Sequence, residues 1–315
     1  MFLKRIVLVL AVASVALTSS SCVFAARMLY REAQRAQARA EIDDDESGDS
    51  SVRNLPANAR VVRDVAYGSD AKQRFDVYAP AHVVNAPVIF MVHGGGWAHG
   101  DKGMSRVVEN KAKYWLPQGY VLISINNRLL PQAGVEEQAQ DVAQALAYAQ
   151  AHASEWGADA SKFVLMGHSA GAHLIALVTS SPTLAAQAGA KPWRGSVILD
   201  SAAYDVGGIM RGRHFPLYDR AFGSDAGRWS ALSPLNVLAR ATPPVLAVCS
   251  SQRMQSCAQA RAYVDKAKGL GTRASVLPQD LSHSEINATL GAAGAYTEAV
   301  DGFLRSLGLA APPGR

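Results

Sequence analysis

Apolar runs that alternate with longer helical stretches constrain the fold of this 315-residue chain more than any other feature. Short runs rich in β-branched residues predict strands, and several of them are apolar at every position rather than at every second one. Strands of that kind belong to a parallel sheet with helices on both faces. The predicted strands cover residues 61–67, 74–78, 87–92, 120–125, 163–166, 196–199, 245–248 and 274–277.

Helical patterns between these runs complete the fold class. They predict helices at residues 136–153, 170–179, 257–270 and 295–307. Alternating strands and helices indicate a three-layer α/β sandwich with a mostly parallel central sheet. The first two strands are expected to be exposed. Residues 203–240 interrupt the alternation after the sixth strand and predict a small insertion of the kind that forms a lid.

The composition fits one large domain and excludes several classes of protein. Hydrophobic residues make up 49% of the chain and charged residues 18%, which excludes a disordered chain. Three cysteines are too few for a small disulfide-dense protein. The net charge of +5 comes without a clustered basic face, so no nucleic-acid partner is predicted.

The N-terminus is typical of an export signal. Lys4 and Arg5 precede an apolar run at residues 6–17, and small residues follow it. Cleavage after Ala25 would make residues 1–25 a signal peptide. Lipid attachment at Cys22, or retention of residues 6–26 as a membrane anchor, are the alternatives. Each of these alternatives predicts an exported protein, periplasmic or secreted. Lipid attachment or a retained anchor would also attach the protein to a membrane through its N-terminus.

A charged tether is predicted between this leader and the folded domain. Residues 26–58 carry arginines at helical spacing and then an acidic run with serine and glycine, a composition that cannot bury a core. The domain itself is expected to cover residues 59–310.

Two of the three cysteines, Cys249 and Cys257, lie close together inside the predicted domain. In an oxidising compartment they would form a disulfide that closes a short loop. Two free buried thiols are the alternative.

The sequence G-H-S-A-G at residues 167–171 directly follows a predicted strand and directly precedes a predicted helix. This is the context of the nucleophile elbow, G-x-S-x-G. Its glycines make room for a strained turn that exposes a serine hydroxyl at a helix N-terminus. Ser169 is therefore the predicted nucleophile, with a simple tight turn as the alternative. His168, beside it, is a predicted substrate contact.

The sequence H-G-G-G-W at residues 93–97 follows the third predicted strand. Glycines let backbone N–H groups face a small oxyanion, and each such donor is worth about 3 kcal/mol in a transition state. We assign a predicted oxyanion hole to the N–H groups of Gly95, Gly96 and Ala170. Trp97 is expected to form a wall of the acyl pocket, with plain packing as the alternative.

His283 follows the last predicted strand, in the chain order serine, acid, histidine that this topology requires. It is predicted to take the proton of Ser169 and to return it to the leaving group.

These motifs resemble the α/β-hydrolase superfamily, specifically the HGGG-type carboxylesterases related to hormone-sensitive lipase and the bacterial feruloyl-esterase-like group. The resemblance covers about residues 59–308. It rests on residues 93–97, G-D-K at 100–102, N-R-L at 127–129, residues 167–171 and S-P-L at 233–235.

The resemblance implies a serine carboxylesterase that acts on short-chain acyl or aryl esters through an acyl-enzyme. It implies no metal and no cofactor, and the expected partner is a small-molecule ester substrate. An amidase or formamidase that uses the same machinery is the alternative.

The triad acid is missing from its usual place. The family usually carries it just after the strand at residues 245–248, but residues 249–257 contain no carboxylate. Asp200, which ends the preceding strand, is the first candidate. The alternatives are Asp205, Asp280 and Glu285. If none of them reaches His283, Gln255 merely positions the histidine, and the protein is a slow esterase or a degenerate binding module.

Overall fold

The computed structural model describes Met28, residues 51–253 and residues 255–309. The chain divides into two units, Met1–Asp44 and Asp45–Arg315. The predicted leader at residues 1–25 lies outside the described residues, as does the predicted tether up to residue 50 except for Met28. Among the residues that the structure describes, no helix is long and apolar enough to cross a membrane.

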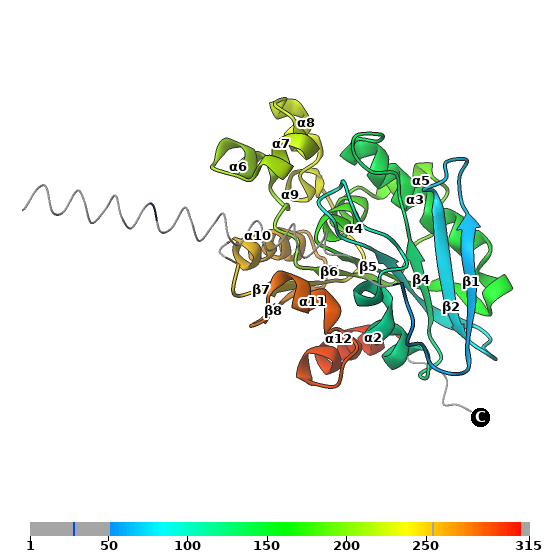
Figure 1. The fold of residues 1–315 in the computed structure, drawn as a ribbon. Helices are drawn as coiled ribbons and strands as arrows, with labels where there is room; N and C mark the ends of the chain where they lie inside the picture. Colours follow the sequence, from blue (N-terminus) through cyan, green and yellow to red (C-terminus); the bar gives the residue numbers. More distant parts are fainter. Residues whose placement is uncertain (1–27, 29–50, 254, 310–315) are drawn as a thin grey trace, which may run out of the picture. The chain divides into compact units, whose positions relative to one another are not determined.

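An eight-stranded sheet in the order β1-β2-β4-β3-β5-β6-β7-β8 forms the centre of the second unit (Figure 1). The strands pair in parallel from β4 through β8, whereas β1–β2 and β2–β4 are antiparallel. All the predicted strands are present, which confirms the predicted fold class. They are β1 Ala59–Ala66, β2 Arg74–Pro80, β3 Ala86–Val92, β4 Val121–Ile125, β5 Ala158–His168, β6 Gly195–Leu199, β7 Val245–Ser250 and β8 Ala274–Gln279.

The inner strands are buried on both faces, as their continuous apolar sequences predict. Every residue of β3, β4, β6 and β7 is buried. The prediction of an exposed second strand is wrong. Residues 75–79 of β2 are all buried, because β2 lies between β1 and β4, and only β1 at the edge has no buried residue.

Helices cover both faces of the sheet, and successive residues of β3 point into opposite halves of the core. Val88, Phe90 and Val92 pack with α3, α4 and α10, whereas Ile89 and Met91 pack with α2 and α12. The predicted helices are all present, but the sequence patterns did not predict α2 or α11. The covering helices are α2 Ser105–Trp115, α3 Val135–Ala151, the 3-10 helix η1 Ala153–Trp156, α4 Ala170–Ser180, α5 Pro182–Gln187, α10 Ser256–Gly269, α11 His283–Ala288 and α12 Ala295–Ser306.

The predicted insertion after the sixth strand is also present. Between β6 and β7 the chain forms four short helices, which Figure 1 shows in yellow-green: α6 Val206–Arg211, α7 Pro216–Phe222, α8 Ala226–Ala231 and α9 Pro234–Val237. The insertion therefore follows β6, whose last residue, Leu199, directly precedes Asp200.

The end of the predicted tether packs against α2. Val52 is only 8% exposed, and the Arg53 and Asn54 N–H groups donate to the Glu109 carboxylate of α2, at 2.7 and 3.0 Å. Ser51 forms an isolated bridge with Met104. The predicted tether boundary at residue 58 is therefore wrong for residues 51–54, because one buried side chain and one carboxylate attach this segment to α2.

Candidate active site

Ser169 stands on a strained turn between β5 and α4. Its backbone lies at φ 54° and ψ −118°, a region that costs a non-glycine residue about 1–3 kcal/mol. Gly171 makes the turn possible, because a Cβ there would lie 2.3 Å from the His93 carbonyl oxygen. The turn leaves Ser169 half-buried while its neighbours in β5 and α4 are buried. The predicted strand–turn–helix context is thus present.

The glycine-rich loop at residues 93–97 passes directly against this serine. A Cβ at Gly94 would lie 3.0 Å from the Ser169 Cβ. Gly95 and Gly96 both have positive φ, at 114° and 55°, so the loop turns back beside Ser169. The two motifs, far apart in the sequence, form one surface.

The register of the sheet brings the other candidate residues to the same edge. His168 pairs with Leu199, and Leu199 pairs with Val248, so Ser169 and Asp200 follow neighbouring paired positions. The carboxyl ends of parallel strands are where α/β proteins place their sites.

Asp200 is the candidate acid that the structure brings to His283. The Asp200 Oδ2 atom lies 2.6 Å from the His283 Nδ1 atom, and the two side chains are 0% and 8% exposed. The other three carboxylates have different partners. Asp205 caps α6, Asp280 accepts from Gln252, and Glu285 reaches back to the Ser282 N–H. Gln255 is exposed at the start of α10.

Among the described residues, three groups besides His283 hydrogen-bond to the Asp200 carboxylate. The Ser250 N–H donates to Oδ1 at 2.7 Å, the Ser256 hydroxyl also donates to Oδ1, and the Arg253 guanidinium lies 2.8 Å from Oδ2. Burial alone would raise the pKa of Asp200, but the Arg253 charge and the bonds from His283 and Ser250 hold it well below its usual range. Asp200 is therefore an anion, and its carboxylate accepts the proton on His283 Nδ1.

Sequence reasoning missed Arg253 and Ser256. Neither residue belongs to a motif, and each is more than 50 positions from Asp200 along the chain. The pairing of β6 with β7 creates these contacts, so no local pattern could have revealed them.

His168 does not fit the substrate contact expected for it. It is only 2% exposed, its Nε2 donates to the His283 carbonyl oxygen at 2.9 Å, and its ring lies 4.4 Å from the His283 ring. Burial, with His283 adding to it, holds the pKa of His168 well below 6.5, so the ring is neutral. These contacts orient His283 rather than meet a ligand.

Trp97 has the contacts of a packing residue, the alternative weighed for it. It is 4% exposed, and its ring centroid lies 4.9 Å from that of Phe222 in the insertion. Its Nε1–H donates to His173 Nδ1 at 3.3 Å, and His173 Nε2 donates to the Leu232 carbonyl oxygen at 2.8 Å. Trp97 therefore links the glycine-rich loop to the insertion.

The two cysteines of the domain, Cys249 and Cys257, form a disulfide in the structure. Within the described part of the chain, no cluster of three or more histidine, cysteine or acidic side chains is arranged to hold a metal ion.

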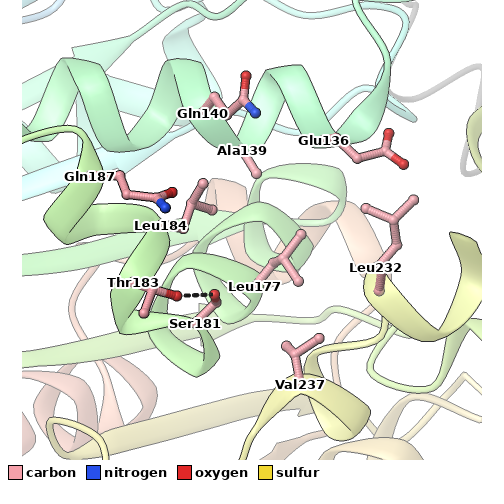
Figure 2. A pocket seen from close by; sticks show the side chains of 11 residues that line it. Glu136, Ala139, Gln140, Leu177, Ser181, Thr183, Leu184, Gln187, Leu232 and Val237 are labelled. Carbon is pink, nitrogen blue, oxygen red and sulfur yellow. Dashed lines mark hydrogen bonds between the residues drawn. The ribbon is translucent and has the colours of Figure 1, made fainter.

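A pocket of about 210 Å³ lies between α3, α4, α5 and the insertion (Figure 2). Leu177, Leu184, Leu232 and Val237 form its apolar part, and Gln140 and Gln187 are among the polar residues around it. Ser169 and His283 are not among its lining residues, so it is separate from the candidate active site.

The sheet order, the elbow and the His–Asp pair at the carboxyl edge are features of the α/β-hydrolase fold. Esterase B from Lactobacillus rhamnosis has the same fold, with a TM-score of 0.68 at 20% identity over 91% of this chain and 95% of that one. Residues 75–190 match the BD-FAE family. The family match is confined to residues 75–190, and together with the fold it agrees with the resemblance to hormone-sensitive-lipase-like α/β-hydrolases that the motifs indicated.

Two curated relatives each match a little over a third of the chain. Esterase LipC of Mycobacterium tuberculosis is 36% identical over 119 residues, which are 36% of this chain and 28% of LipC. A probable isoprenylcysteine alpha-carbonyl methylesterase of rice, Oryza sativa, is 30% identical over 120 residues, which are 38% of this chain and 28% of the relative. The matches thus span less than a third of each relative's length.

Proposed function

We propose that this protein is a serine carboxylesterase that hydrolyses short-chain acyl or aryl esters through an acyl-enzyme. The single observation that carries the proposal is the 2.6 Å contact between Asp200 Oδ2 and His283 Nδ1, at the sheet edge where Ser169 occupies a strained elbow. The names of the relatives, esterases and a methylesterase, support an ester rather than an amide as substrate.

The roles follow from the protonation states. Because Asp200 is an anion that accepts from Nδ1, the proton of neutral His283 resides on Nδ1 and its Nε2 is free to act as a base. Ser169 attacks the ester carbonyl and His283 takes its proton. His283 then returns that proton to the leaving alcohol, and Asp200 stabilises the imidazolium between the two steps. In the second half of the reaction, water attacks the acyl-enzyme and His283 takes a proton from it. His283 then returns that proton to the Ser169 oxygen as the carboxylic acid leaves.

The oxyanion hole in this proposal consists of the N–H groups of Gly95, Gly96 and Ala170. Gly94 packs against Ser169, which brings its neighbours in the loop near the nucleophile, and Gly96 faces open space on its Cβ side. Ala170 begins α4, and N–H groups in the first turn of a helix have no partner within that helix. Each donor would contribute about 3 kcal/mol to the transition state.

The proposal includes export from the cytoplasm. Residues 1–25 would act as a signal peptide, or residues 6–26 as an anchor, with lipid attachment at Cys22 as a third route. The Cys249–Cys257 disulfide supports an oxidising compartment.

Hydrolysis of p-nitrophenyl acetate tests the proposal. Ser169→Ala is expected to lower the rate at least about a thousandfold, because no other group supplies the nucleophile. The matched control is Ser154→Ala, an exposed serine of η1, which should leave the rate unchanged. A fluorophosphonate probe should label the wild type at Ser169. A folded wild type that is neither labelled nor active would instead favour a binding module.

A further inference from the structure

The loop of residues 249–257, which includes the end of β7 and the start of α10, surrounds the carboxylate of Asp200. Within the described residues, every hydrogen bond to that carboxylate comes either from His283 or from this loop. Ser250 and Ser256 hold Oδ1, and Arg253 holds Oδ2. The loop therefore fixes both oxygens of the carboxylate, which leaves Asp200 one orientation toward the imidazole.

The three loop residues all lie between the two ends of the disulfide. Cys249 is the fifth residue of β7 and Cys257 the second residue of α10, and both are buried. A crosslink over eight positions removes most of the freedom of the chain that it encloses. The disulfide thus holds the donors of the Asp200 carboxylate in place independently of the insertion, which lies before β7.

Arg253 makes the most specific of these contacts. Its Nη1 atom lies 2.8 Å from Asp200 Oδ2 and 3.0 Å from the Asp200 carbonyl oxygen, and its side chain is only 11% exposed. The same Oδ2 atom accepts from His283 Nδ1. A cation on that oxygen holds the carboxylate in place and also opposes a second positive charge on the imidazole ring.

We propose that the disulfide-closed loop of residues 249–257 is a clamp that positions Asp200, and that Arg253 is its principal positioning residue. This inference rests on the proposed esterase function, in which Asp200 is the triad acid. In related proteins this loop carries the acid itself, as the resemblance implies. Here it holds an acid from the neighbouring strand instead.

The charges around His283 determine the direction of the expected pH effect. Arg253 is the nearest cation on the side of Asp200, and it disfavours the protonated ring. Among the described residues, the other titratable or charged groups that face the ring or its helix come from β5, α2, the end of β6, α12 and α11 itself: His168, Lys111, Asp200, Tyr296 and Glu285. All of them are retained when Arg253 alone is replaced, so the change in the profile reports on Arg253.

The test compares Arg253→Gln with Arg253→Lys and with Arg261→Gln, an exposed arginine of α10. With p-nitrophenyl acetate, Arg253→Gln should lower kcat about ten- to a hundredfold, because a small displacement of a catalytic group has effects of that size. KM should stay within about twofold, because Arg253 is proposed to act through Asp200, which it contacts. The acidic limb of the pH–rate profile should move to higher pH. Arg253→Lys keeps the charge and should restore most of the profile, and Arg261→Gln should match the wild type.

The outcomes separate the two claims. If the wild type and Arg261→Gln hydrolyse the ester and Arg253→Gln has the same kcat and pH profile, the clamp is refuted and the esterase stands. If the wild type is inactive, the proposed function fails, and the clamp with it. A midpoint of thermal unfolding for each variant shows that it is folded.

The disulfide supplies a second, independent test. The double variant Cys249→Ser, Cys257→Ser should show a kcat lowered in the same range with KM little changed, since the loop residues would no longer be held against Asp200. If the folded double variant keeps the wild-type kcat, the disulfide has no part in positioning the acid and the clamp as proposed is wrong.

Discussion

At the scale of single residues, backbone strain is concentrated around the candidate site. Among the described residues, non-glycine positions with positive φ are Asp64, Asn85, Trp97, Ser169 and Asp200. The last three belong to the glycine-rich loop, the elbow and the His–Asp pair. Each such position costs about 1–3 kcal/mol and persists only where the surrounding structure fixes it. Ser169 and Asp200 directly follow β5 and β6, and their strained backbone directs both side chains toward the same site.

His173 illustrates a second feature at this scale, a buried histidine without a catalytic role. It joins Trp97 to the Leu232 carbonyl oxygen, and burial lowers its pKa to about 4. An unfolded histidine titrates near pH 6.5. Between these values the unfolded chain binds more protons than the folded one, so the stability due to neutral His173 is complete above about pH 6.5 and is lost as the pH falls toward 4.

The substitution His173→Gln tests this linkage. Glutamine still donates to the Leu232 carbonyl oxygen but cannot take up a proton. We expect the free energy of unfolding of the wild type to fall by about 2–3 kcal/mol more than that of the variant between pH 7.5 and 4.5, as measured by urea unfolding. His168 is present in both proteins, so its contribution cancels. Equal pH dependence in the two proteins would show that His173 does not remain neutral when folded.

At the scale of elements, the sequence predicted the strands better than the helices. Continuous apolar runs identify β3, β4, β6 and β7, since only a doubly covered strand can be apolar throughout. The burial of β2 could not be predicted, because it depends on which strands pair beside it. The helix α11 escaped prediction because its six residues are too few for a helical period.

The segment before β1 shows the same limit and leads to a prediction. The packing of residues 51–54 could not be predicted from their mostly polar sequence. It depends on the burial of Val52 and on hydrogen bonds to the Glu109 carboxylate of α2. A protein that begins at residue 59 should therefore be less stable than one that begins at residue 51, by about 2 kcal/mol for one buried valine and two hydrogen bonds. Urea unfolding of the two proteins measures this difference. The absence of a difference would mean that the segment belongs to the tether, as the sequence suggested.

At the scale of the whole molecule, the order of motifs along the chain predicted the site because the parallel sheet gathers strand ends at one edge. Ser169, Asp200 and His283 follow β5, β6 and β8, and the register places the first two side by side. The partners of Asp200 in the loop after β7 could not be predicted, because they depend on the course of a loop with no motif. The acid and its clamp thus come from two different strand ends.

The kcat of Asp200→Asn on p-nitrophenyl acetate, relative to the wild type, tests the central claim most directly. An amide keeps the shape of the side chain, but it cannot stabilise the imidazolium and favours the wrong tautomer of His283. The account therefore predicts a kcat about 10⁴-fold lower. Asp280→Asn, which alters a carboxylate bonded to Gln252, should stay at the wild-type value. If Asp200→Asn instead retains a kcat within about twofold of the wild type, Asp200 is not the triad acid and the proposed mechanism is wrong.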